Sequence, residues 1–321
     1  MIFKLQHISY FRAELMGFAI LWIMSFHFEF MQIPLLPYIT QYGYAGVEIF
    51  MFVSGFGIFY SLRGKSKNLF HFYKKRITRI FPAYYLIGIL DSIFVFHDNL
   101  VTYLFRFSTI GYWFGSTFDD WYIPSLIILY IFSPQIIRLL KPNKLAIVWI
   151  TITIFILLTI CFTFNPILER HYYFLVYRIP AFLFGMLCAY WQTERKGDFF
   201  FVAINIICLP VFIILFRLYP IYYNYRFSAF LFLMPAIIIT LTSFFRMNIS
   251  MLNYTLSNIG KASLEIYMVQ GFLYHLYIFH FIVIPIQFHD IIAITSIMFS
   301  TFSGILLHHL INNFLKVFKE V

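Results

Sequence analysis

The sequence predicts an all-α membrane protein, a bundle of about ten transmembrane helices with both termini in the cytoplasm. The chain has 321 residues, of which 62% are hydrophobic and only 11% charged. Its mean hydropathy is +0.83. Apolar runs long enough to cross a bilayer recur along the whole chain, a composition that soluble domains of this length do not have. The first run lacks a small-residue cleavage pattern and is followed at once by more spans, so we interpret it as retained.

Ten apolar runs of about 16 to 25 residues are predicted to be membrane spans. Their approximate limits are 14–32, 43–62, 81–96, 121–138, 145–162, 172–191, 199–216, 227–245, 262–282 and 290–312. The longest polar gaps are the connections 63–80 and 97–120. We therefore interpret residues 1–321 as a single transmembrane domain without a separate soluble domain.

The distribution of basic residues supports this span count. With both termini inside, most of the 23 Lys and Arg residues fall on the cytoplasmic side. The opposite side receives Arg106, Arg170, Arg178, Arg217 and Arg226. The positive-inside rule predicts such an asymmetry, and a missed or extra span would scramble it.

Several binding functions find no support in the composition. The three cysteines, Cys161, Cys188 and Cys208, lie in apolar segments and offer no disulfide framework and no Cys/His metal pattern. The 44 Phe and 24 Tyr residues scatter through the spans and their ends, which is typical of lipid-facing and interfacial aromatics. We expect a lipid bilayer as partner, and neither a metal nor nucleic acid; the sequence leaves homo-oligomerisation open.

His27 is an ionisable side chain within the first predicted span. Its imidazole titrates near neutral pH and can accept a proton from a hydroxyl, which no neighbour in that apolar run can do. Ionisable groups at membrane depth are costly and are functional candidates by default. The alternative is a histidine that reaches the interface or serves helix packing.

The densest cluster of charge precedes the third span, in the segment 72–85. Arg76 and Arg79 are three residues apart, so on a helix they share one face and can close on one phosphate group. Pro82 is expected to open the third span, where its missing N–H is harmless. For Lys65, Lys67 and Lys74, the favoured interpretation is an anchor on anionic lipid.

Six short motifs, in order, resemble acyltransferase family 3, a family of bacterial integral membrane proteins. They are Ala13-Glu-Leu-Met-Gly-Phe-Ala-Ile-Leu with His27; Gly46-Val-Glu-Ile-Phe-Met-Phe-Val-Ser-Gly-Phe56; the arginine pair within Tyr73 to Tyr85; Asp120-Trp-Tyr-Ile-Pro124; Arg178-Ile-Pro-Ala-Phe-Leu-Phe-Gly185; and Ser263-Leu-Glu-Ile-Tyr267. Each motif is weak by itself. Together they cover about 250 residues on a ten-span frame.

The resemblance implies transfer of an acyl group, usually acetyl, from cytoplasmic acyl-CoA to a hydroxyl of a carbohydrate or envelope glycan, at the bacterial inner membrane. This chain departs from the family pattern twice. Met16 stands where the family has an arginine that ten intervening residues separate from the catalytic histidine, and Arg12, one helical turn earlier on roughly the same face, can serve instead. Gln270 stands where the family often has a second histidine, and an amide there can keep a hydrogen bond.

On this basis His27 is expected to be catalytic, as general base on the acceptor hydroxyl or as transient acyl carrier. Glu48 is expected either to orient His27 or to pair with an arginine. The coenzyme A phosphates are expected to bind the basic residues Arg12, Lys75, Arg76 and Arg79. His27 lies about 20 Å from Arg12 along a helix, comparable to an extended pantetheine arm.

The acceptor is expected to meet Asp120 and Trp121, because a carboxylate beside an aromatic ring suits sugar recognition; an interfacial tryptophan is the alternative. Arg178 is expected to clamp a polar group of the substrate or a lipid headgroup. Glu265 and Tyr267 are two residues apart on a helix, so they are expected to contact different neighbours. Four further residues are interpreted as structural: Asp91, His275, His308 and His309.

Two other functions stay open at this point. A secondary transporter or exporter of a small or lipid-linked sugar would also place charges within the membrane. Against it, the chain lacks the paired discontinuous helices typical of inverted-repeat transporters. A membrane scaffold with degenerate site residues is the third alternative, because Met16 and Gln270 depart from the family pattern.

Overall fold

The computed structural model describes residues 3–28, 33–63, 68–115, 121–140, 170–193, 197–218, 225–278 and 288–317, and within these ranges every regular element is helical. The longer helices are α2 (Arg12–His27), α4 (Gly46–Arg63), α5 (Leu69–Asp91), α7 (Tyr122–Leu140), α9 (Arg170–Thr193), α10 (Gly197–Leu218), α11 (Tyr225–Phe245), α12 (Ser250–Lys261), α13 (Ser263–Ile278) and α14 (His289–Val317). The shorter ones are α1 (Gln6–Tyr10), α3 (Leu36–Thr40), η1 (Gly43–Ala45), the π-helix η2 (Ser92–Phe96), α6 (Leu100–Arg106) and η3 (Gly111–Phe114).

Six stretches among the described residues are helical, long and apolar enough to cross a membrane. They are Leu36–Arg63, Leu69–Phe96, Tyr122–Leu140, Phe174–Thr193, Asp198–Arg217 and His289–Lys316, with Ala229–Phe245 as a shorter apolar helix. Each predicted span except the fifth coincides with a helix, and the fifth, 145–162, lies outside the described residues. The all-helical membrane fold is thus confirmed, whereas the count of ten spans and the cytoplasmic termini stay predictions.

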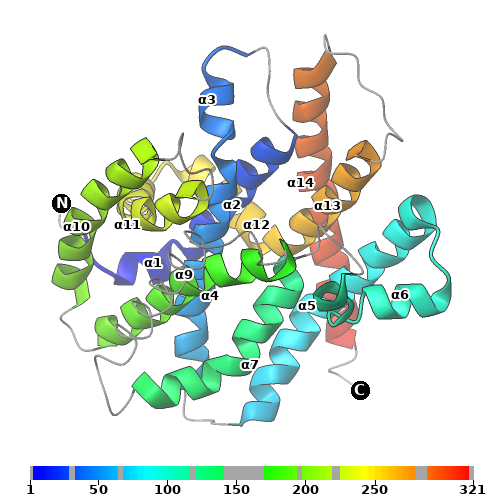
Figure 1. Cartoon of the computed structure of the whole chain (residues 1–321), viewed down its shortest axis with the longest axis horizontal. Helices are drawn as coiled ribbons and strands as arrows, with labels where there is room; N and C mark the ends of the chain where they lie inside the picture. The colour runs from blue at the N-terminus through cyan, green and yellow to red at the C-terminus, as the bar shows by residue number, and fades with distance from the viewer. Residues whose placement is uncertain are drawn as a thin grey trace.

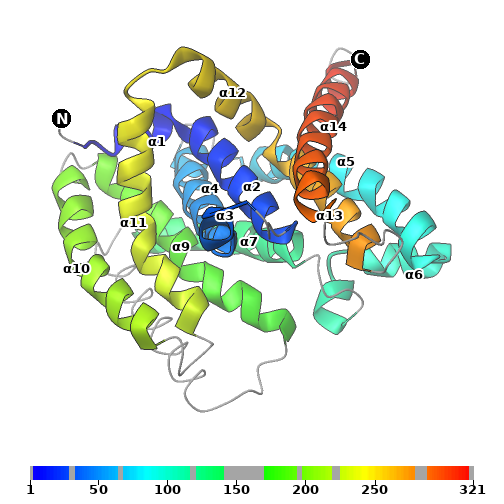
Figure 2. The same cartoon turned by 90° about the horizontal axis from the view of Figure 1, so that it is seen from above.

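Helices α2 and α4 form the centre of the molecule, and the remaining helices group on two sides of them. On one side, α9 packs along α4, and α10 and α11 pack against each other (Figure 1). On the other side, α13 packs against α5 and α14, as the view from above shows (Figure 2). This arrangement leaves α2 facing α13, which sets up the site described below.

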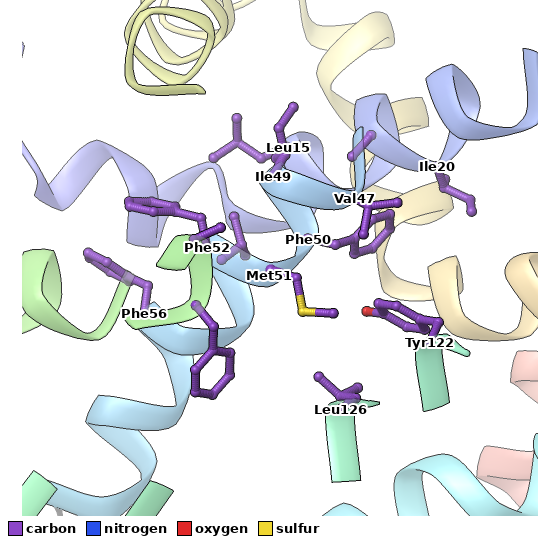
Figure 3. Packing of buried hydrophobic residues seen from close by; sticks show 14 of the residues in the cluster. Leu15, Ile20, Val47, Ile49, Phe50, Met51, Phe52, Phe56, Tyr122 and Leu126 are labelled. Atoms are coloured by element: carbon purple, nitrogen blue, oxygen red, sulfur yellow. The ribbon is translucent and has the colours of Figure 1, made fainter. Parts of the chain in front are cut away.

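Glycines allow α4 and α9 to approach closely. A Cβ added to Gly55 would lie 2.0 Å from the carbonyl oxygen of Phe182, and one added to Gly185 would lie 2.0 Å from that of Phe52. Neither contact could tolerate a side chain, so the two backbones touch, as small residues permit in membrane helices. On another face of α4, Met51 points toward Tyr122 and Leu126 of α7 within the apolar core (Figure 3).

The third predicted span begins twelve residues earlier than expected. Asn68 caps α5 by accepting hydrogen bonds from the backbone N–H groups of Phe70 (2.9 Å) and His71 (3.3 Å), so the helix already contains the whole basic cluster. The prediction that Pro82 opens this span is therefore wrong, because Pro82 lies inside α5. There its ring removes the backbone hydrogen bond to Thr78.

Candidate active site

A cavity of about 730 Å³ connects the basic residues near the start of α2 with His27 at its end. Most residues with a predicted role in the reaction line it: Arg12, His27, Lys75, Arg76, Arg79, Trp121, Arg178 and Tyr267. Helices α2, α5, α9 and α13, which are distant in the sequence, carry seven of them, and Trp121 directly precedes α7. Glu48 and Glu265 lie just behind the wall, each paired with an arginine that lines it. Asp120 lies outside the described residues.

The basic end of the cavity holds cationic side chains without a carboxylate partner. Within the described part of the chain, no ion pair involves Arg12, Lys75 or Arg76. The guanidinium of Arg12 packs against Gly57, where an added Cβ would lie 2.7 Å from its Cζ. Arg12 and Met16 both line the cavity, as expected for residues one turn apart on α2.

Arg76 is held by aromatic rings. Its guanidinium carbon lies 5.3 Å from the ring centroid of Phe72 and 5.6 Å from that of Tyr130. These are cation–π distances, which fix the group without neutralising its charge. Its buried Nε has no hydrogen-bond partner among the described residues. A buried unpaired donor is costly and favours a bound acceptor such as a phosphate oxygen.

Arg79 differs from Arg76, because a buried carboxylate engages it. Its guanidinium forms a two-point ion pair with Glu265 and also donates to the carbonyl of Lys261 at 3.0 Å. Glu265 in turn accepts a hydrogen bond from Nδ1 of His308 at 3.0 Å. This network joins α5, α13 and α14 and gives Arg79 a carboxylate partner that Arg76 lacks among the described residues. Both arginines line the cavity, and joint binding of a phosphate by the two stays a prediction.

His27 is half-buried at the last residue of α2. Its Nδ1 lies 2.5 Å from the amide nitrogen of Gln270, so the hydrogen bond expected of Gln270 is present. The ring of Tyr274, one turn further along α13, stacks on the imidazole with ring centroids 5.0 Å apart. Gln270 and Tyr274 thus orient the imidazole from the same face of α13.

Glu48 and Arg178 form an ion pair between α4 and α9, with only 1% and 3% of their side chains exposed. Of the two roles expected for Glu48, the structure therefore shows pairing with an arginine. The Arg178 guanidinium also lies 5.7 Å from the ring centroid of Trp121, and Trp121 stacks on Phe174 at 5.1 Å. Trp121, Phe174 and Arg178 form one wall of the cavity, which offers both a flat aromatic surface and a hydrogen-bond donor.

Tyr267 and Glu265 face different neighbours, as their spacing predicts. The Tyr267 ring packs against Tyr122 of α7 with centroids 5.1 Å apart, whereas Glu265 turns toward α5 and α14. Asp91 and His275, for which only a structural role is expected from the sequence, both line the cavity. The sequence shows that each is an ionisable residue in an apolar segment, which marks it as a candidate for a functional role. It does not show that the two side chains meet, because their contact depends on how α5 packs against α13.

Comparison with known proteins gives an independent result. The family described as "Acyltransferase domain", Acyl_transf_3, matches residues 15–310. "Putative acetyltransferase ORF330" of Acidianus two-tailed virus is 32% identical over 179 residues, which is 53% of this chain and 52% of that protein. The chain thus spans about half the length of this curated relative. No solved structure matches. Since the family match covers nearly the whole chain, this protein belongs to acyltransferase family 3.

Proposed function

We propose that the protein is a membrane O-acyltransferase that moves an acyl group from cytoplasmic acyl-CoA to a hydroxyl of an exported or envelope carbohydrate. The observation that carries the proposal is the cavity that joins Arg12, Lys75 and Arg76, three cations with no carboxylate partner among the described residues, to His27. Cations suited to an anionic donor and an imidazole suited to act as general base thus line one cavity in a protein of an acyltransferase family.

The basic end suits the phosphates of coenzyme A. Arg12 and His27 are the first and last residues of α2, so they lie about 22 Å apart along the helix axis at 1.5 Å per residue. An extended pantetheine arm covers a comparable length. With the phosphates held by Arg12, Lys75 and Arg76, the thioester would reach the imidazole. The similarity to a protein named as an acetyltransferase favours acetyl-CoA as the donor.

His27 would act either as general base on the acceptor hydroxyl or as nucleophile that carries the acyl group. Either role needs a lone pair on the nitrogen that faces the reactants. Gln270 is compatible with this state, because rotating its amide by 180° presents Oε1 to a protonated Nδ1 and leaves Nε2 as the base. That Oε1 is buried and lacks a hydrogen-bond partner among the described residues.

The acceptor would occupy the aromatic wall. Trp121 and Phe174 offer flat rings on which a sugar can stack, and Arg178 offers N–H donors to its oxygens. Asp120, next to Trp121 in the sequence, would add a carboxylate. We place the protein in a bacterial inner membrane, where cytoplasmic acyl-CoA and exported glycans are both within reach.

The test uses purified protein in detergent with acetyl-CoA and measures release of the CoA thiol. His27→Ala should abolish this release while the variant inserts and elutes as the wild type does. His309→Ala serves as the matched control, because His309 does not line the cavity. An acyl mass added to envelope glycans only when the active protein is expressed would identify the acceptor. Full thiol release by His27→Ala would contradict the proposal, and sugar transport without acetyl-CoA would favour a transporter.

A further inference from the structure

A second imidazole lies in the same cavity, together with a carboxylate. His275 of α13 and Asp91 of α5 are each 3% exposed, and Nδ1 of His275 lies 3.0 Å from Oδ1 of Asp91. Both residues line the cavity that contains His27. A packing role alone would be served by apolar side chains, because burying an ionisable pair in a membrane helix bundle is costly.

The hydrogen bond to Asp91 defines which nitrogen of His275 carries the proton. A carboxylate accepts, so Nδ1 of His275 is the donor and Nε2 keeps its lone pair. The ring of Phe96 packs edge-on against the imidazole with centroids 5.6 Å apart, which limits its rotation. Asp91 ends α5, where the chain continues as the π-helix Ser92–Phe96. Such π-helical turns are frequent at functional sites.

The order of groups along the helices places this pair beyond His27 as seen from the basic end. On α13, Glu265 pairs with Arg79, Gln270 contacts His27, and His275 follows Gln270 by five residues, or about 7.5 Å. On α5, Asp91 lies twelve residues beyond Arg79, or about 18 Å. Helix α13 thus leads from the cations past His27 to the Asp91–His275 pair, and α5 leads from the same cations to that pair.

We propose that His275, held by Asp91, is the general base for the acceptor hydroxyl, and that His27 carries the acyl group between the two substrates. This inference rests on the proposed function. In the first step, Nε2 of His27 attacks the thioester carbon, the C–S bond breaks, and CoA leaves as thiolate. His27 is then an acyl-imidazolium that keeps its proton on Nδ1.

In the second step, the acceptor oxygen attacks the acyl carbon while its proton passes to Nε2 of His275. The C–N bond to His27 breaks, its electron pair returns to Nε2, and His27 is neutral again. The Asp91 carboxylate stabilises the His275 imidazolium that forms. His275 then releases its proton to solvent, which offsets the negative charge of the CoA thiolate. A separate base is needed here, because an acylated His27 has no free nitrogen to accept a proton.

The experiment separates the two steps with acetyl-CoA as donor and water and glycerol as the acceptor hydroxyls. Purified His275→Gln and Asp91→Asn are compared with the wild type in a rapid-mixing assay for thiol release, and intact-protein mass spectrometry detects the acetyl-enzyme. Both variants should retain a burst of about one thiol per protein. Their steady-state turnover should fall by about 10²- to 10⁴-fold, the usual contribution of a general base. The KM for acetyl-CoA should fall with it, because the second step becomes rate-limiting, so kcat/KM for acetyl-CoA should stay unchanged.

His289→Gln is the matched control, because His289 is also buried but contacts a separate cavity of about 40 Å³ with Tyr277 as its partner. It should leave burst and turnover unchanged. The assignment would be overturned if folded His275→Gln lost both the burst and the turnover, or if it kept normal turnover. It would also be overturned if the wild type formed the acetyl-enzyme but passed acetyl to neither water nor glycerol. If the wild type releases no thiol at all, the proposed function fails and this inference fails with it.

Discussion

Breaking the ion pair between Glu48 and Arg178 should destabilise the protein far more than removing both charges together. The pair joins α4 to α9, and its side chains are only 1% and 3% exposed. One carboxylate oxygen and the Arg178 Nε have no hydrogen-bond partner in the described residues, and the ring of Trp121 only partly compensates the Arg178 charge if Glu48 is lost. Removing one member of a buried pair typically costs about 3–5 kcal/mol.

The perturbation is a double-mutant cycle with Glu48→Leu, Arg178→Met and the double variant. Each single variant should lose about 3–5 kcal/mol, because an uncompensated charge stays buried. The double variant should recover most of this loss, since an apolar pair of similar volume needs no desolvated charge. The coupling free energy should therefore be about 5 kcal/mol or more, above the roughly 0.5–3 kcal/mol usual for contacting residues.

Reversible unfolding in mixed detergent micelles, followed by tryptophan fluorescence, measures these free energies. Trp121 lies against the Arg178 guanidinium and serves as a local reporter. The control is Tyr60→Phe, which removes an exposed 2.6 Å hydrogen bond from Tyr60 to Gln192 between the same two helices and should cost only about 0.5–1.5 kcal/mol. Single-variant losses below 1 kcal/mol, or losses that simply add in the double variant, would refute the reasoning.

Three further predictions concern helix packing, donor binding and imidazole orientation. Gly260→Ala should lower the thermal midpoint of unfolding, because the new Cβ would lie 1.8 Å from the carbonyl oxygen of Ala13. Gly271→Ala should raise the thermal midpoint slightly, because its Cβ would meet open space and alanine has the higher helix propensity. Arg76→Gln should raise the KM for acetyl-CoA about 10- to 100-fold, because the donor loses one charge-assisted hydrogen bond. Lys74→Gln is the control, because Lys74 is exposed and does not line the cavity, and its KM should match that of the wild type. Equal KM values for the two variants would contradict the donor site. Gln270→Leu should lower kcat at unchanged KM, because His27 loses its hydrogen-bond partner, and an unaltered kcat would argue against that role.

The sequence by itself determined the membrane class, the helical fold and the presence of an ionisable residue, His27, in the first apolar run. These follow from local properties: apolar runs, charge distribution, and one ionisable group where none is expected. The short motifs also identified the family, which the match over residues 15–310 confirms. The helix start at Asn68 was missed, because the polar segment before the third span resembles a loop on hydropathy alone.

Only the tertiary structure decided which charged groups meet. Arg76 and Arg79 look alike in the sequence, yet Glu265 engages Arg79 while Arg76 keeps its charge over aromatic rings. Asp91 and His275 are 184 residues apart, and their contact exists because α13 packs against α5. Ion pairs within a helix bundle depend on helix rotation and register, which side-chain packing across the interface determines. Residue spacing within one helix therefore shows which side chains share a face, but not which partner that face meets.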